Sequence, residues 1–187
     1  MSMMEEFSLA GCCGIFCGLC AKYQSKAPSR CIGCRLGEQH SWCSIYRCCV
    51  MKKGFTTCTE CKEYPCERYS RRGWGTDELS KTAEESLESI KKTGMKDWLE
   101  EQRNRRLLLE NLLANYNEGR SMSFYCLAAM LMPPKLIEKA ISELKEKLAT
   151  NQLDSSDIKA KAKAARETIQ GLAQKSGIEL KLRKREV

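Results

Sequence analysis

The stretch GCCGIFCGLC, residues 11–20, places four cysteines within nine positions. The chain of 187 residues holds thirteen cysteines, and twelve of them lie between Cys12 and Cys66, whereas Cys126 stands alone. An odd total argues against a complete disulfide framework, and free thiols at this density are prone to oxidation. We therefore interpret this density as metal ligation, with structural disulfides as the alternative.

The spacing of the cysteines gives this interpretation its detail. Three C-x2-C pairs occur, namely Cys17 with Cys20, Cys31 with Cys34 and Cys58 with Cys61. Two intervening residues form a tight turn that brings both sulfurs to one ion. The first two pairs supply four sulfurs, a tetrahedral set, and the five cysteines from position 43 to position 66 supply a second. The pattern predicts zinc, with about two ions bound.

The spacings do not decide which cysteines bind the same ion. Neighbouring C-x2-C pairs can share an ion (sequential pairing), or alternate pairs can do so (cross-braced pairing). If Cys12 and Cys49 also bind, twelve cysteines suffice for three tetrahedral sites. His40, the only histidine, lies between two cysteines and can replace a thiolate in a Cys3His site. A [4Fe–4S] cluster is the alternative to zinc, because four cysteines at short spacing also suit iron and sulfide.

Composition restricts the class of protein. The chain is 42% hydrophobic and 30% charged, which is typical of a globular protein. No apolar run approaches the roughly 20 residues of a membrane span, and the N-terminal MSMMEEFSLAG lacks the basic start of a secretory signal. We therefore expect a cytoplasmic protein with reduced thiols and no membrane association.

The organisation along the chain predicts a mainly α protein. Residues 1–69 form a small irregular, cysteine-rich metal-binding domain, 70–75 form a linker, and 76–187 form a helical domain with a basic tail. About five helices are expected, with breaks at Gly94, Gly119 and the Pro133–Pro134 pair, and IELKLRK at 178–184 alternates like a strand. Large aliphatic residues are scarce between the cysteines, so metal binding is expected to drive folding there.

The motifs CGIFCGLCAKY, CIGC, WCSIYRCC and GFTTCTECKEYPCERY resemble a family of small bacterial and archaeal proteins with a cysteine-rich domain of unknown function that is expected to bind zinc. The later stretch LLANYNEGRSMSFYCLAAMLMP resembles the helical part that often follows that domain. The resemblance implies metal ligation at matching positions and implies no reaction. These positions are Cys13, Cys17, Cys20, Cys31, Cys34, Cys43, Cys48, Cys58, Cys61 and Cys66.

The function predicted is a non-catalytic module in which structural zinc sites present a surface to an unidentified protein partner. Closed four-sulfur sites lack the open position that catalysis requires, and the chain shows no catalytic constellation or phosphate-binding glycine loop. An iron–sulfur redox or electron-transfer protein is the first alternative. Zinc-dependent nucleic-acid binding is the second alternative, and it rests on Lys52, Lys53, Arg71, Arg72 and Trp74. The net charge of +8, however, falls to about +4 when two zinc ions are each bound by four thiolates.

Cys126, in an apolar helix, is expected to be a buried core residue.

Overall fold

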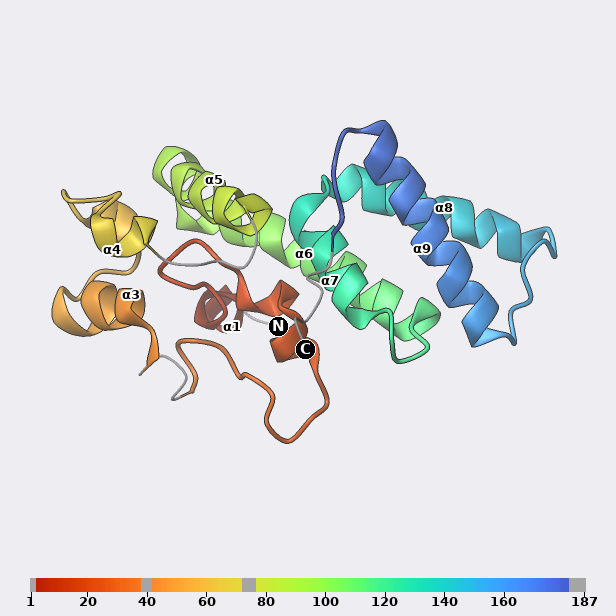
Figure 1. The fold of residues 1–187 in the computed structure, drawn as a ribbon, viewed down its shortest axis with the longest axis horizontal. Coiled ribbons are helices and arrows are strands. Elements are labelled where there is room, and N and C mark those ends of the chain that lie inside the picture. Colours follow the sequence, from red (N-terminus) through yellow and green to blue (C-terminus); the bar gives the residue numbers. More distant parts are fainter. Residues whose placement is uncertain (1–2, 38–41, 72–76, 182–187) are drawn as a thin grey trace. The chain divides into compact units, whose positions relative to one another are not determined.

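The computed structural model describes residues 3–37, 42–71 and 77–181, and contacts divide the chain into two compact units, residues 1–103 and 104–187 (Figure 1). The described residues contain α-helices, short turns and irregular segments, and no strand beyond an isolated antiparallel bridge between Ala10 and Phe16. The predicted fold class is confirmed, because a cysteine-rich N-terminal region precedes five longer helices.

The cysteine-rich region consists of short elements separated by turns. In chain order they are α1 (Met3–Ser8), the 3-10 turn η1 (Cys17–Leu19), α2 (Ala21–Gln24), α3 (Ser44–Tyr46), the π-helical segment η3 (Arg47–Lys52), the 3-10 turn η4 (Cys58–Glu60) and α4 (Glu67–Ser70). None of these elements has the length at which a helix is stable by itself in water. Their positions therefore depend on tertiary contacts.

Helix α5 (Asp77–Thr93) and the beginning of α6 (Met95–Tyr116) complete the core of the first unit. Phe16 meets Trp98 edge to face, with ring centroids 6.0 Å apart, and both side chains are buried. Gly14 has φ +92°, and a Cβ there would lie 2.1 Å from the carbonyl oxygen of Ala83 in α5. The turn that carries the first cysteines therefore packs directly against α5, and only glycine fits the contact.

The second unit contains the rest of α6 with α7 (Met122–Leu131), α8 (Pro134–Ala149) and α9 (Ile158–Lys175). Pro134 starts α8 at a position where its missing N–H costs no hydrogen bond. The Asp157 carboxylate caps α9 by accepting hydrogen bonds from the backbone N–H groups of Lys159 and Ala160 at 2.8 and 3.0 Å. Helices α8 and α9 pack against each other. The core consists of fully buried aliphatic side chains, including Leu109, Leu112, Ile137, Leu144 and Ile169.

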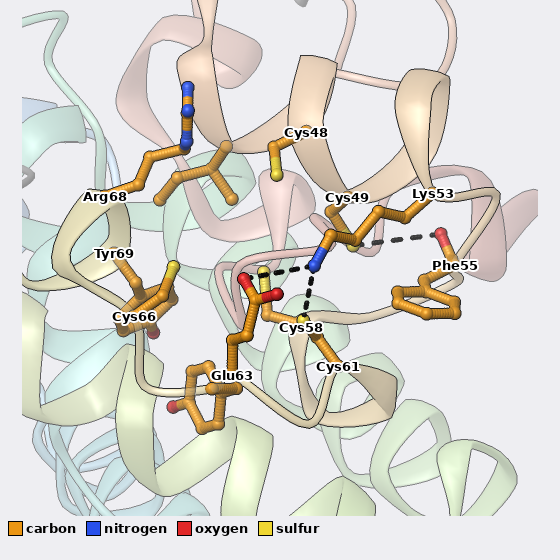
Figure 2. A pocket seen from close by; sticks show the side chains of 12 residues that line it. Cys48, Cys49, Lys53, Phe55, Cys58, Cys61, Glu63, Cys66, Arg68 and Tyr69 are labelled. Atoms are coloured by element: carbon orange, nitrogen blue, oxygen red, sulfur yellow. Dashed lines mark hydrogen bonds and ion pairs between the residues drawn. The ribbon is translucent and has the colours of Figure 1, made fainter.

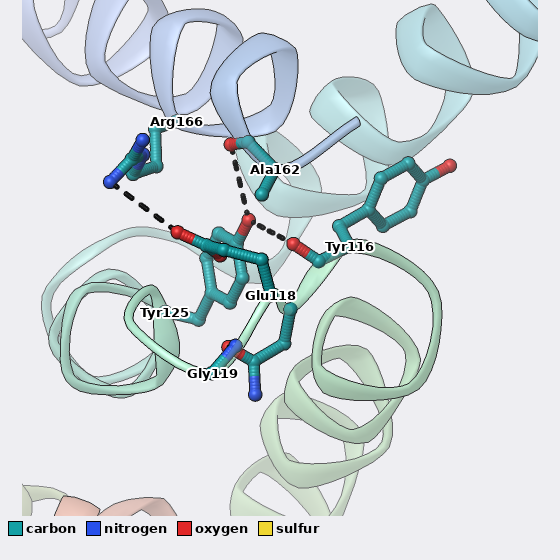
Figure 3. A network of polar contacts seen from close by, with 7 residues as sticks. Tyr116, Glu118, Gly119, Tyr125, Ala162 and Arg166 are labelled. Atoms are coloured by element: carbon teal, nitrogen blue, oxygen red, sulfur yellow. Dashed lines mark hydrogen bonds and ion pairs between the residues drawn. The ribbon is translucent and has the colours of Figure 1, made fainter. Parts of the chain in front are cut away.

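A polar network ties three helices of the second unit together (Figure 3). The buried hydroxyl of Tyr125 on α7 donates a hydrogen bond of 2.8 Å to the carbonyl oxygen of Tyr116, at the end of α6. Beside it, Arg166 of α9 lies 3.8 Å from Glu118. The Tyr116 carbonyl is one of the terminal groups that has no partner within its own helix, so Tyr125 caps α6 from a neighbouring element.

The strand predicted over residues 178–184 is wrong for its described part, because residues 178–181 form no strand and pair with no neighbour as one. Alternation of apolar and charged residues does not suffice where no second strand is available to pair with it. The predicted linker at 70–75 falls mostly outside the described residues, so the domain boundary there stays a prediction.

No helix among the described residues combines the length and apolar character that crossing a membrane requires.

Candidate metal centre

Two of the C-x2-C pairs form the tight turns that their spacing predicts. In η1 the backbone N–H of Cys20 donates to the carbonyl oxygen of Cys17 at 2.9 Å, and in η4 Cys61 donates to Cys58 at 3.1 Å. A capping box supports the second turn, since the Glu60 carboxylate accepts from the backbone N–H of Thr57 at 2.8 Å. The local sequence therefore fixes the backbone of η4 before any ion is considered.

A cluster of three sulfurs, which we call the triad, forms between separate segments of the region. The Sγ atoms of Cys12, Cys49 and Cys58 all lie within 4.8 Å of one another. Cys12 and Cys49 are buried and Cys58 is half-buried. The backbone N–H of Cys58 donates to the carbonyl oxygen of Cys12 at 2.9 Å, which ties the first cysteine turn to η4. The triad is therefore part of the interior.

Arg35 holds the segments around the triad in place. Its Nε donates to the carbonyl oxygen of Ala10 at 2.8 Å, and its Nη2 donates to that of Thr56 at 2.7 Å. These two residues lie two positions before Cys12 and Cys58. One guanidinium thus links the two backbone segments that supply two of the three sulfurs, and it adds positive charge near a site rich in sulfur.

The triad distributes its protons unequally. Hydrogen bonding from the Cys12 thiol, and then from Cys58, lowers the pKa of Cys49 to about 4. The same hydrogen bond to Cys49 is the main cause that raises the pKa of Cys12, and burial adds to it. These hydrogen bonds therefore favour the thiolate at Cys49 and the thiol at Cys12. A metal ion at this place would replace those shared protons, because ligating cysteines are thiolates.

A small cavity lies beside the triad, and five cysteines line it (Figure 2). Its volume of about 30 Å³ accommodates a water-sized species or an ion. The sulfur-bearing residues of the lining are Cys48, Cys49, Cys58, Cys61 and Cys66. The ammonium of Lys53 donates to Cys61 Sγ at 3.0 Å and lies 3.2 Å from Glu63 Oε2, and these contacts raise the pKa of Lys53, with Cys61 the larger cause.

The donor set fits a thiophilic ion. Around a tetrahedral zinc ion with Zn–S bonds of about 2.3 Å, the sulfurs lie roughly 3.8 Å apart. The three sulfurs of the triad lie within 4.8 Å of one another, which is compatible with that spacing. Three sulfurs leave one position of a tetrahedron, and further sulfurs line the adjoining cavity. The cluster could therefore hold a metal ion.

The predicted ligands are distributed unevenly. Cys48, Cys58, Cys61 and Cys66 share the cavity, and Cys17 contacts Cys34 by a side-chain hydrogen bond that, with burial, raises the pKa of Cys17. The other predicted ligands, Cys13, Cys20, Cys31 and Cys43, belong to no group of three close ligand atoms among the described residues. Cys43 and Cys31 accept backbone hydrogen bonds at 3.4 Å from Tyr46 and Gly33. Ligation at these positions stays a prediction, and His40 lies outside the described residues.

Sequence reasoning left Cys12 and Cys49 out of the predicted ligand set. Each belongs to a doublet, Cys12 with Cys13 and Cys48 with Cys49, and the spacing argument used only the other member. In the structure it is the omitted member of each doublet that joins the triad. The available signal was the doublet itself, because adjacent residues point in different directions and can serve two sites. Cys126, by contrast, is buried in α7 as expected.

Comparison with known proteins places only the N-terminal part of the chain. Residues 9–71 match the model of a family described as a protein of unknown function, DUF3795. No curated protein and no solved structure matched the chain. The expected resemblance is therefore supported as a match to a family of unknown function. Because the match ends at residue 71, the resemblance predicted for the later helices stays a prediction.

Proposed function

We propose that residues 9–71 form a zinc-stabilised module that binds a protein partner. The observation that carries this proposal is the triad, in which Cys12, Cys49 and Cys58 converge from three segments to within 4.8 Å. Because these three thiols come from distant positions in the sequence, one ion bound to all of them would order all three segments. The free energy of ion binding then becomes part of the free energy of folding.

We propose Cys61 as the fourth ligand. It shares the η4 turn with Cys58 at C-x2-C spacing, and its sulfur lines the cavity beside the triad. Lys53 donates a hydrogen bond to this sulfur at 3.0 Å, and hydrogen bonds of this kind to a ligand atom orient the ligand and tune a metal site. In this arrangement Lys53 offsets part of the negative charge that four thiolates leave on a divalent ion.

The exposed surface of the same region favours a protein partner. Trp42 is 89% exposed and Met51 is 64% exposed, and both residue types are enriched in protein interfaces. The basic residues that motivate nucleic-acid binding are partly neutralised, because Lys53 pairs with Glu63 and Arg71 pairs with Glu67. A salt titration against a labelled single-stranded oligonucleotide separates these alternatives. We expect no binding at physiological ionic strength, whereas affinity that falls steeply with salt would support the nucleic-acid alternative.

Elemental analysis of anaerobically purified protein tests the metal assignment. We expect stoichiometric zinc in the wild type, loss of one ion in Cys12→Ser, Cys49→Ser and Cys58→Ser, and unchanged zinc in the control Cys126→Ala. Cys126 is a suitable control because it is also a buried cysteine but lies in α7 of the second unit. Full zinc content in all three triad variants would refute the site.

A [4Fe–4S] cluster is the second candidate, and the number of sulfurs around one cavity favours it. Five cysteines line the same space, which exceeds the four thiolates that one tetrahedral ion accepts. An iron–sulfur centre would give a brown protein with broad visible absorption and equal amounts of iron and sulfide. A colourless protein with zinc alone excludes it.

A further inference from the structure

Two hollows of different depth share the same pair of cysteines. Cys48 and Cys66 line the interior cavity beside the triad, and they also line an outer hollow of about 650 Å³. The other residues around the outer hollow include Arg47, Lys52 and Glu67, all of them exposed. Cys48 and Cys66 thus line both hollows, together with Lys53, Glu63 and Arg68.

The cysteines differ in which hollow they reach. Cys48 and Cys66 line both hollows, Cys49 and Cys58 line the interior cavity alone and belong to the triad, and the buried Cys12 of the triad lines neither. Figure 2 shows the sulfurs of Cys48, Cys58 and Cys66 directed toward the same space. An ion that enters from the outer hollow therefore meets sulfur at every stage.

We propose that Cys48 and Cys66 are loading ligands that pass a thiophilic ion, such as zinc, between solvent and the triad. This inference rests on the proposed metal site and adds the route by which that site fills and empties. Cys48, Cys66 and Cys61 all lie outside the group of three close ligand atoms found among the described residues, and Cys48 and Cys66 differ from Cys61 in also lining the outer hollow. Cys61 is not part of the outer hollow, and its sulfur is held by Lys53 at 3.0 Å.

Each transfer would be a ligand exchange without change of oxidation state. A triad sulfur would form its bond to the ion as the bond from Cys48 or Cys66 breaks; a triad sulfur that is still a thiol would release its proton to water, and the departing thiolate would take one up. Exchange between neighbouring thiolates avoids a stage at which the ion is stripped of all its ligands. Removal of the outer sulfurs should therefore slow filling and emptying alike, without changing the equilibrium between them.

Zinc release from the loaded full-length protein tests the route. The double variant C48S/C66S and the wild type are loaded with zinc and mixed with excess chromophoric chelator, and the rates of release and the starting zinc contents are compared. We expect equal zinc content and release about tenfold slower, the effect of losing roughly 1.4 kcal/mol of transition-state stabilisation. The control Cys126→Ala should release zinc at the wild-type rate.

The remaining outcomes are decisive. A lower zinc content in C48S/C66S would make these residues permanent ligands and overturn the loading role, and so would an unchanged or faster rate of release. Failure of the proposed metal site is recognised separately, because Cys58→Ser would then keep its full zinc content. Far-UV circular dichroism of the loaded double variant, matched to wild type, ensures that the comparison is made between folded proteins.

Discussion

The cysteine-rich segment, residues 9–71, and the second unit, residues 104–187, close their interiors with different side chains. The interior of the second unit is aliphatic, with Leu112, Ile137 and Leu144 fully buried. In the cysteine-rich segment, Cys12, Cys13, Cys17 and Cys49 are among the buried residues. Aliphatic side chains stabilise an interior by leaving water, whereas clustered thiols that share protons gain most when an ion replaces those protons.

The cysteine-rich segment also packs against apolar side chains from outside its own sequence. Leu9, Phe16 and Leu19 are buried, and Phe16 packs against Trp98, which lies outside the segment in α6. The interior of the second unit is therefore filled by apolar side chains without an ion, whereas apolar side chains fill only part of the interior of the cysteine-rich segment.

The largest effect is expected from Cys58→Ser. Loss of one triad sulfur should release the ion and unfold residues 9–71, because apparent binding free energies of structural zinc, about 10–16 kcal/mol in zinc-finger peptides, rival the whole stability of a domain. Hydrogen exchange resolved by segment measures the outcome. We expect rapid exchange in residues 9–71 and retained protection in residues 104–187. A zinc-free variant with protected residues 9–71 would remove the distinction between the two interiors.

The reciprocal change is Leu144→Ala in the second unit. Leu144 is fully buried, and such truncations cost about 2–5 kcal/mol because they leave a cavity. Hydrogen exchange measured at increasing urea concentrations should show weaker protection of residues 104–187, and the zinc content should stay unchanged. Leu107→Ala is the matched control, since Leu107 is 50% exposed in α6 of the same unit. Zinc loss in Leu144→Ala would show that the two interiors are coupled.

The same difference explains what the sequence could predict. The five longer helices were predictable because periodic apolar residues and local stop signals act over a few positions, as at Gly94, with φ +90°, and at Pro134. The turn at Cys58 was predictable for the same local reason. The triad was not, because its sulfurs come from positions 12, 49 and 58, and the packing of separate segments decides which member of a doublet turns inward.

A smaller effect is expected from Tyr125→Phe, which removes one hydroxyl from the interior of the second unit. The Tyr116 carbonyl would lose its 2.8 Å partner in a buried place, at a cost of about 1–3 kcal/mol. Urea unfolding measures the change. Tyr116→Phe is the control, because its ring is also buried, and its hydroxyl makes no hydrogen bond among the described residues. Equal destabilisation by both variants would mean that the hydroxyl of Tyr125 contributes nothing specific.

The smallest effect is a pH dependence carried by the same hydroxyl. Burial, the largest cause, raises the pKa of Tyr125 from its ordinary value of 10.0 to about 12. Above pH 10 the unfolded tyrosine loses its proton while the folded one keeps it, so the folded state binds more protons and its stability falls as pH rises toward 12. Phenylalanine cannot titrate, so the destabilisation by Tyr125→Phe should be constant below pH 10 and shrink above it. Urea unfolding of both proteins at a series of pH values measures this difference, in which the other titrating groups largely cancel. A difference that stays constant above pH 10 would show that water reaches this hydroxyl, and that the interior of the second unit is less closed than its packing implies.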